Sequence, residues 1–187
     1  AFDLAKRSNG QIHVLNAYDL PYSDRSMTSS LLEVMKENAE KNMAAYEAKL
    51  KAYGTPFKTH VRLGNPIRLI KEMASKKDID MVVMGTKGAS GIEEVLIGSN
   101  AASVIQNTQK PVLVIPPGVK AHAFKTMVFA SDFDLAKQEN ALLQLKAFAD
   151  LYALKIDVVH VQKDSGSAAG SREKVESILG NLKSEFT

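Results

Sequence analysis

Two short runs of consecutive apolar residues, at positions 81–84 and 112–115, restrict the fold of this chain more than any other feature. Each run has the length of a strand and falls far short of the roughly 18 apolar residues that a membrane span needs. A strand without alternating polar residues is typical of a parallel sheet that is covered on both faces. A helical segment separates the two runs, as the crossovers of such a sheet require. The pattern therefore predicts an α/β fold.

Further strands and helices extend this alternation. Residues 12–17 and 57–63 are expected to form strands, and Pro66 is expected in the first turn of a helix over residues 67–75. A longer helix, ending at Gly54, carries apolar residues three or four positions apart on one core-facing stripe. The stripe consists of Met35, Ala39, Met43, Tyr46, Leu50 and Tyr53.

A segment rich in turn formers divides the chain. Two prolines and a glycine at positions 116–118 end the last apolar strand, and no periodic pattern resumes before Phe124. We therefore expect two domains, over residues 1–118 and 119–187. The second unit is expected to contain a strand over 126–130, a helix over 135–151, a strand over 156–161 and a helix from Ser171 onward.

The second unit matches the first when the sequence is shifted by 144 positions. The identical pairs include Ala5 with Ala149, Ile12 with Ile156, and Val14 with Val158. Helix and strand then fall in the same order, which indicates a tandem repeat. On this alignment the strand over 126–130 has no counterpart in the first repeat, and the second repeat stops inside its second helix. We therefore expect both repeats to be incomplete in this chain.

A glycine-rich segment follows the first apolar run. Gly85 and Gly88 come after the carboxyl end of a strand, which is where open α/β sheets bind ligands, and they let the backbone approach an anion closely. After nine intervening residues, Gly98 and Ser99 begin a helix over residues 99–107, whose first N–H groups can bind an anion. The Ser99 hydroxyl would serve either as helix cap or as phosphate donor. The alternative interpretation is turn glycines and an ordinary N-cap, since the motif is neither a Walker A sequence nor a G-x-G-x-x-G fingerprint.

The spacing of these residues, flanked by the two apolar strands, resembles the ATP-binding class of universal stress proteins. Gly64-Asn65-Pro66, Asp80 at the start of a strand and Asp132-Phe133 in the second repeat are similar to the same family. The resemblance implies an open, parallel, five-stranded sheet with helices on both faces, of the adenine nucleotide alpha hydrolase-like type. It also implies a cytoplasmic protein of the stress response.

The resemblance further implies which residues contact the nucleotide, mostly through their backbone. They are Met84, Gly85, Gly88, Gly98, Ser99 and Asn100, with Ala17 where the family's backbone contacts adenine. Members that bind ATP also use an acidic residue after their first strand, and this chain has that position only in the second repeat, as Asp132. The counterpart for the first repeat either precedes Ala1, which is simpler, or comes from the strand over 126–130 of this chain or another copy.

The expected ligand is ATP or a related adenine nucleotide, with or without Mg²⁺. ATP turnover would be slow at most, because the sequence offers no placed general base or arginine finger. The expected partner is a second copy of this chain; alternatively, the two repeats of one chain pair with each other. An alternative is an assembly module of the same family that lacks the nucleotide and dimerises through the strand over 112–115.

Composition and spacing argue against several other functions. The net charge of +3 arises from scattered residues, aromatics make up 6% of the chain and tryptophan is absent, which disfavours nucleic-acid binding. The absence of cysteine excludes disulfides and thiolate ligands and is typical of a cytosolic protein. The four histidines lack the spacing of a metal site. The sequence also contains no G-x-S-x-G motif, which would indicate a hydrolase.

Overall fold

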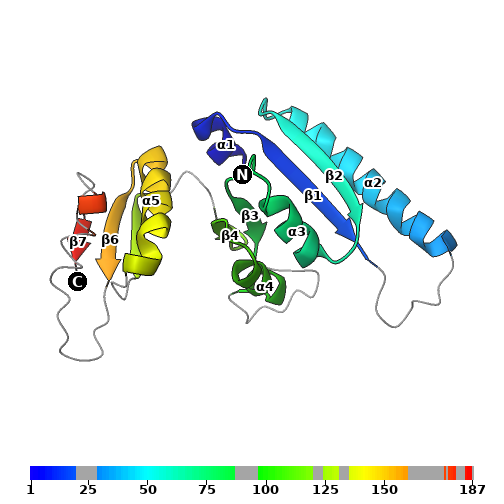
Figure 1. Ribbon diagram of the computed structural model, residues 1–187. Helices are drawn as coiled ribbons and strands as arrows, with labels where there is room; N and C mark the ends of the chain where they lie inside the picture. Colours follow the sequence, from blue (N-terminus) through cyan, green and yellow to red (C-terminus); the bar gives the residue numbers. More distant parts are fainter. Residues whose placement is uncertain are drawn as a thin grey trace. The chain divides into compact units, whose positions relative to one another are not determined.

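Helices and parallel strands alternate along the chain in the computed structural model, which confirms the predicted α/β fold (Figure 1). The structure describes residues 1–19, 29–86, 97–119, 124–130, 135–159, 175, 177–179 and 184–186. The chain divides into two units, Ala1–Val119 and Lys120–Thr187. In the described parts, no helix is long and apolar enough to span a lipid bilayer.

The first unit alternates helices with strands from its beginning to its end. Its elements are α1 (Phe2–Ser8), β1 (Ile12–Tyr18), α2 (Ser29–Lys51), β2 (Phe57–Leu63), α3 (Pro66–Ala74), β3 (Val82–Gly85), α4 (Ser99–Asn107) and β4 (Val112–Ile115). β1 pairs in parallel with β2, Ile12 lying opposite Phe57, and β3 pairs in parallel with β4, Val82 lying opposite Val112. Each pair is joined by a helix, because parallel neighbours need a crossover connection.

The strands of this unit form two separate ladders. No backbone ladder joins β1 and β2 to β3 and β4 among the residues described. Helix α3, which leads from one ladder to the other, contacts both β1 and α4. Side-chain packing through α3 therefore links the two ladders, and the single five-stranded sheet stays a prediction.

Helix α3 begins as its sequence predicts. The Asn65 side chain accepts hydrogen bonds from the backbone N–H groups of Ile67 and Arg68, at 3.0 and 3.1 Å. Pro66 occupies the first turn, where its missing N–H costs nothing. Further along the helix, Leu69 and Met73 are buried. The predicted start at Gly64-Asn65-Pro66 is thus confirmed, and the helix ends one residue earlier than expected.

Helix α2 buries a narrower stripe than its sequence predicts. Ala39, Met43 and Leu50 are buried, but Tyr46 is 60% exposed and Tyr53 lies beyond the helix end. The Tyr53 ring instead stacks on Phe2 of α1, with ring centroids 4.3 Å apart. The expectation that both tyrosines belong to the core stripe is therefore wrong. The reason is that α2 covers a ladder of only two strands, β1 and β2, which is too narrow to cover a full helical face.

The strands of the first unit are less buried than expected. Val82, Val83 and Met84 of β3 are only partly buried, as are all four residues of β4. The prediction that these strands are covered on both faces is therefore wrong for the described residues. A two-stranded ladder exposes both of its edges, so apolar side chains at those edges retain contact with solvent.

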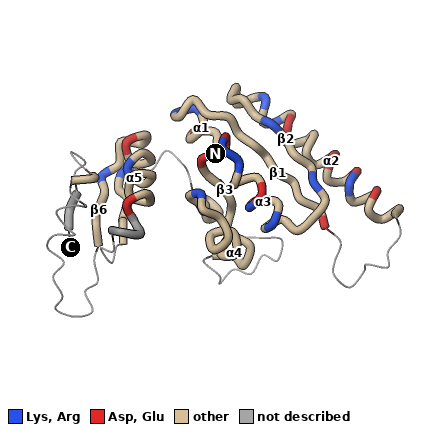
Figure 2. Tube along the Cα trace, in the orientation of Figure 1, with Lys and Arg blue, Asp and Glu red and all other residues tan. Residues whose placement is uncertain are grey.

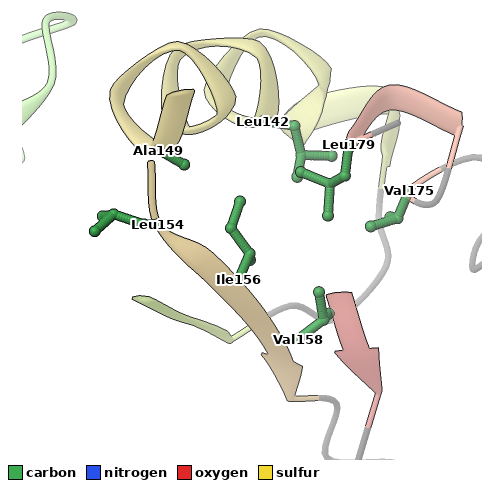
Figure 3. Close-up of a cluster of buried hydrophobic side chains, with 7 residues drawn as sticks. All are labelled: Leu142, Ala149, Leu154, Ile156, Val158, Val175 and Leu179. Atoms are coloured by element: carbon green, nitrogen blue, oxygen red, sulfur yellow. The ribbon is translucent and has the colours of Figure 1, made fainter. Parts of the chain in front are cut away.

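The second unit is a parallel three-stranded sheet packed against a helix. Its elements are β5 (Thr126–Ala130), α5 (Leu135–Tyr152), β6 (Lys155–Val159) and β7 (Ser184–Phe186). β6 is the central strand, paired in parallel with β5 on one side and β7 on the other. Its core, drawn in Figure 3, consists of Leu142, Ala149, Leu154, Ile156, Val158, Val175 and Leu179.

Two details of this unit differ from the sequence prediction. β6 begins one residue earlier than expected, at Lys155, and its assigned range ends at Val159. A helix was expected from Ser171 onward, and the described residues 175 and 177–179 are helical, but Ser184–Phe186 forms a strand. With one apolar residue in three, β7 has no strand pattern of its own, and its conformation depends on pairing with β6.

Candidate functional site

Thr86 connects the end of β3 to the start of α4. Its carbonyl oxygen accepts a hydrogen bond from the Gly98 N–H at 3.0 Å, and its own N–H donates to the Ile115 carbonyl oxygen at 3.2 Å. Thr86 is 6% exposed, so these bonds are shielded from water. The carboxyl ends of β3 and β4 and the beginning of α4 consequently meet at one residue. In open parallel sheets this is the edge that binds ligands.

The first turn of α4 has backbone donors without an acceptor among the described residues. Gly98 is the N-cap residue, in an extended conformation with φ −64° and ψ 155°, and the first helical bond runs from the Ala102 N–H to the Gly98 carbonyl oxygen. The N–H groups of Ser99, Asn100 and Ala101 therefore have no acceptor within the helix. No side chain caps this helix end in the described structure, and its first turn contains no acidic residue. Such an end attracts anions through its N–H groups and its dipole.

Gly98, and not Ser99, occupies the capping position of α4. Ser99 is the first helical residue and is exposed, as is Asn100. Of the two roles predicted for the Ser99 hydroxyl, the cap is therefore wrong. The reason is that the extended backbone conformation of an N-cap falls on Gly98, one residue earlier.

The structure brings most of the predicted site residues to this edge. Met84 and Gly85 are the last residues of β3, opposite Val114 and Ile115 of β4. Those at the start of α4 are Gly98, Ser99 and Asn100. Gly88 and Asp132 lie outside the described residues.

Ala17 lies on the other ladder of the unit. It is the penultimate residue of β1, opposite Arg62 of β2. Its strand has no recorded pairing with β3 in the described structure. Its predicted contact with adenine stays a prediction.

Sequence reasoning missed Thr86. The glycines around it carried the motif, and a threonine directly after an apolar strand was not distinguished from an ordinary loop residue. Its β-branched side chain was the available signal, because such a residue favours the extended conformation that continues β3 to the bond with Ile115.

Sequence reasoning also missed a contact between two histidines of β1 and β2. His13 Nδ1 and His60 Nε2 lie 3.2 Å apart, and partial burial followed by neighbouring positive charges lowers the pKa of His60. The residues are 47 positions apart, so only the register of the ladder brings them together. In the described part of the chain, no group of three or more His, Asp or Glu residues could hold a metal ion.

Comparisons with known proteins place this architecture in a family. The model of the universal stress protein family matches residues 1–116. A universal stress protein of Methanocaldococcus jannaschii is 31% identical over 119 residues, which cover 62% of this chain and 70% of that protein. A putative universal stress protein of Staphylococcus haemolyticus is 29% identical over 125 residues, covering 62% of this chain and 72% of that protein.

A solved structure resembles both units. The crystal structure of a universal stress protein from Archaeoglobus fulgidus covers 99% of this chain and 70% of its own, with a TM-score of 0.75 and 21% identity. At this identity the likeness concerns the fold alone. The family assignment rests on the match between the family model and more than half of this chain. The chain belongs to the universal stress protein family.

Proposed function

We propose that the first unit binds ATP or a related adenine nucleotide with its phosphates at the start of α4, as a regulator in the stress response. One observation carries the proposal: the hydrogen bond between Thr86 and Gly98 holds the strand ends beside an uncapped helix end. Uncapped N–H groups at a helix start are suited to a phosphate anion. The exposed Ser99 and Asn100 leave this helix end open to a ligand.

The residues assigned to the nucleotide are those that the family resemblance implies. The phosphates would be held by backbone groups of Gly85, Gly98, Ser99 and Asn100, together with Gly88 in the segment between them. Met84 and Ala17 would border the nucleoside. ATP would bring Mg²⁺ through its phosphates, because Mg²⁺ usually keeps waters and binds phosphate oxygens. Asp132 stays assigned as the acidic residue of the second repeat.

The proposed role is to hold the nucleotide rather than to turn it over. The residues assigned in the first unit include no general base and no arginine, so hydrolysis would be slow. We assign the protein to the cytoplasm on the family resemblance. Nucleotide binding would act by changing the association of this chain with a second copy or of one repeat with the other.

The backbone supports the proposal that the two units are repeats. α1 and α5 both end on a residue in the left-handed conformation, Asn9 with φ 52° and Ala153 with φ 53°. The next N–H bonds back across the turn in both cases, from Gly10 to the Ala5 carbonyl oxygen at 2.8 Å and from Leu154 to that of Ala149 at 2.9 Å. These bonds are related by the same shift of 144 positions as the sequences. Domains over residues 1–118 and 119–187 are proposed on this basis.

A second candidate function is a dimerisation module without a nucleotide. It is favoured by β4, which is paired only with β3 in the described structure and whose residues are all partly exposed. An unpaired strand edge offers backbone groups to a second chain. Denaturing the purified protein and measuring the absorbance of any released adenine nucleotide distinguishes the two candidates.

The main experiment measures ATP binding by calorimetry in the intact chain and in Gly98→Val and Gly88→Val. The Gly98 backbone, with φ −64° and ψ 155°, is accessible to valine, so the fold should persist while the new side chain obstructs the amides. Thr108→Val, at the far end of α4, is the matched control. We expect ATP binding to be lost in the two glycine variants and kept in the control. Unchanged ATP affinity in both glycine variants would refute the proposed site.

A further inference from the structure

The rings of His13 and His60 stack across the β1–β2 ladder, with centroids 5.2 Å apart. His60 Nε2 lies 3.2 Å from His13 Nδ1, and His13 Nε2 lies 3.3 Å from Gln11 Oε1. An amide oxygen only accepts, so His13 Nε2 carries a proton, and His13 Nδ1 accepts the hydrogen bond that His60 Nε2–H donates. His60 can take a second proton on Nδ1 without breaking the bond to His13.

Positive side chains surround this pair. In a strand, side chains two positions apart share a face, so Lys58, His60 and Arg62 lie on one face of β2. The register places His13 opposite Lys58, on the same face. Lys76, which follows α3, also acts electrostatically on His60. Figure 2 shows basic positions on and near α3 as well as along α2, with acidic positions among them.

One carboxylate partly offsets these charges. Glu72 of α3 forms a two-pronged ion pair with Arg62, whose Nη1 and Nη2 lie 2.8 and 3.3 Å from Glu72 Oε1 and Oε2. Lys58 and Lys76 are exposed and have no ion pair within the described residues. Glu47 of α2 bonds the Thr59 hydroxyl, which belongs to the opposite face of β2. The surroundings of His60 therefore include two lysines without an ion pair among the described residues, and the charge of Lys76 also acts on Glu72.

We infer that the basic cluster, defined as His13, Lys58, His60, Arg62 and Lys76, is a second anion site that takes a phosphate-bearing ligand together with a proton. Two exposed ammonium groups and a titratable imidazole match a multivalent phosphate, which carries several acceptor oxygens. The same positive charges would oppose a metal cation at the two imidazoles. This site lies on the other ladder from α4, and its existence does not depend on the nucleotide proposal.

Anion binding and proton binding are coupled at this cluster. Without a ligand, partial burial and then the charges of His13, Lys76, Arg62 and Lys58 lower the pKa of His60. A bound anion neutralises those charges and raises the pKa of His60 again. By linkage, protonation of His60 must strengthen anion binding to the same extent. The cluster therefore favours its ligand in mildly acidic solution.

The test titrates inorganic tripolyphosphate into the full chain carrying Gly98→Val, so that the proposed α4 site does not contribute. Calorimetry at constant ionic strength, at about pH 5.5 and about pH 7.5, should show binding about tenfold tighter at the lower pH. The His60 ring protons, followed by NMR, should show a higher pKa when tripolyphosphate is present. A shift that sodium chloride of equal ionic strength reproduces would overturn the proposal.

Matched variants separate the cluster from general charge. Lys58→Gln with Lys76→Gln keeps the pair of Arg62 and Glu72 and should weaken tripolyphosphate binding about tenfold. The control, Lys41→Gln with Lys51→Gln, removes the same charge from exposed positions of α2 and should change binding little. Equal weakening in both double variants would overturn the proposal.

Two further measurements address the proton and the source of the phosphate. His60→Gln should remove the pH dependence of binding, and a pH dependence that persists in this variant contradicts the assigned role of His60. If ATP binds with an affinity similar to that of tripolyphosphate, the site also recognises phosphate on a nucleotide. If tripolyphosphate binds and ATP does not, the ligand is a free polyphosphate. Adenosine binding without tripolyphosphate binding would contradict the proposal.

Discussion

Thr86 and Gly98 are joined by a backbone hydrogen bond of 3.0 Å between the Gly98 N–H and the Thr86 carbonyl oxygen. This bond determines where α4 begins relative to the end of β3. Neither side chain takes part in this bond, so its contribution to stability depends on the backbone of Gly98. That backbone has φ −64°, which proline shares.

Gly98→Pro therefore removes this hydrogen bond with little change in backbone shape. We expect the free energy of unfolding of the first unit to fall by about 1 kcal/mol, the usual net value of one such bond. ATP affinity should fall as well, because the helix end is no longer held beside the strands. Denaturant unfolding and calorimetry measure the two effects. Gly98→Ala retains the N–H and is the control; equal stability losses in both variants would show that the bond is unimportant.

The two helix ends at Asn9 and Ala153 should respond differently to glycine. A left-handed conformation strains an alanine by roughly 1–2 kcal/mol, whereas asparagine tolerates it better. Ala153→Gly should therefore raise the stability of the second unit by about 0.5–1 kcal/mol, after allowing for the greater freedom of glycine in the unfolded chain. Asn9→Gly should change the first unit less. The denaturation midpoint of each unit is the measurement, and a loss of stability in Ala153→Gly contradicts the assigned conformation.

The stability of the first unit should decrease as the pH falls below about 6.5. The pKa of His60 is lowered from 6.5 in the folded chain, chiefly by partial burial. The unfolded chain consequently binds a proton more readily than the folded chain does. Denaturant midpoints measured between about pH 5 and about pH 8 should show this loss in the native chain and a flatter profile in His60→Gln. Identical profiles would exclude His60 as the cause.

A second decrease in the stability of the first unit is expected in stronger acid. The hydrogen bond from Arg62 lowers the pKa of Glu72 below 4.5 in the folded chain. The contribution of ionised Glu72 to the stability of the folded chain is present above pH 4.5 and disappears as the pH falls through the lowered pKa. Glu72→Gln should remove this decrease from the denaturation profile, while the decrease below pH 6.5 that His60 causes should remain.

The core of the second unit should depend strongly on Ile156. This side chain on the central strand is 0% exposed and belongs to the cluster in Figure 3. Ile156→Ala should lower the free energy of unfolding by about 2–5 kcal/mol, through lost burial and the cavity that remains. Val128, which is 67% exposed on the neighbouring strand, provides the control as Val128→Ala. Similar midpoints for the two variants in chemical denaturation would contradict the described core.

Local sequence alone determined the elements whose ends are marked by capping residues, proline or glycine. α4 has its predicted bounds, β2 likewise, and α3 starts where Asn65 and Pro66 indicate. These elements are specified by nearest neighbours: a proline fixes one backbone angle, and an asparagine caps the first turn. The glycine spacing predicts the edge where β3 ends and α4 begins for the same local reason.

Only the tertiary structure decided which residues meet across the sequence. Tyr46 fits the apolar stripe of α2 but is exposed, because the two-stranded ladder beneath is too narrow to cover it. Thr86 became recognisable through its bonds to Gly98 and Ile115, and His60 through the register that brings it to His13. Burial, strand register and long-range hydrogen bonds depend on contacts between distant segments, and the periodicity of one segment does not contain that information.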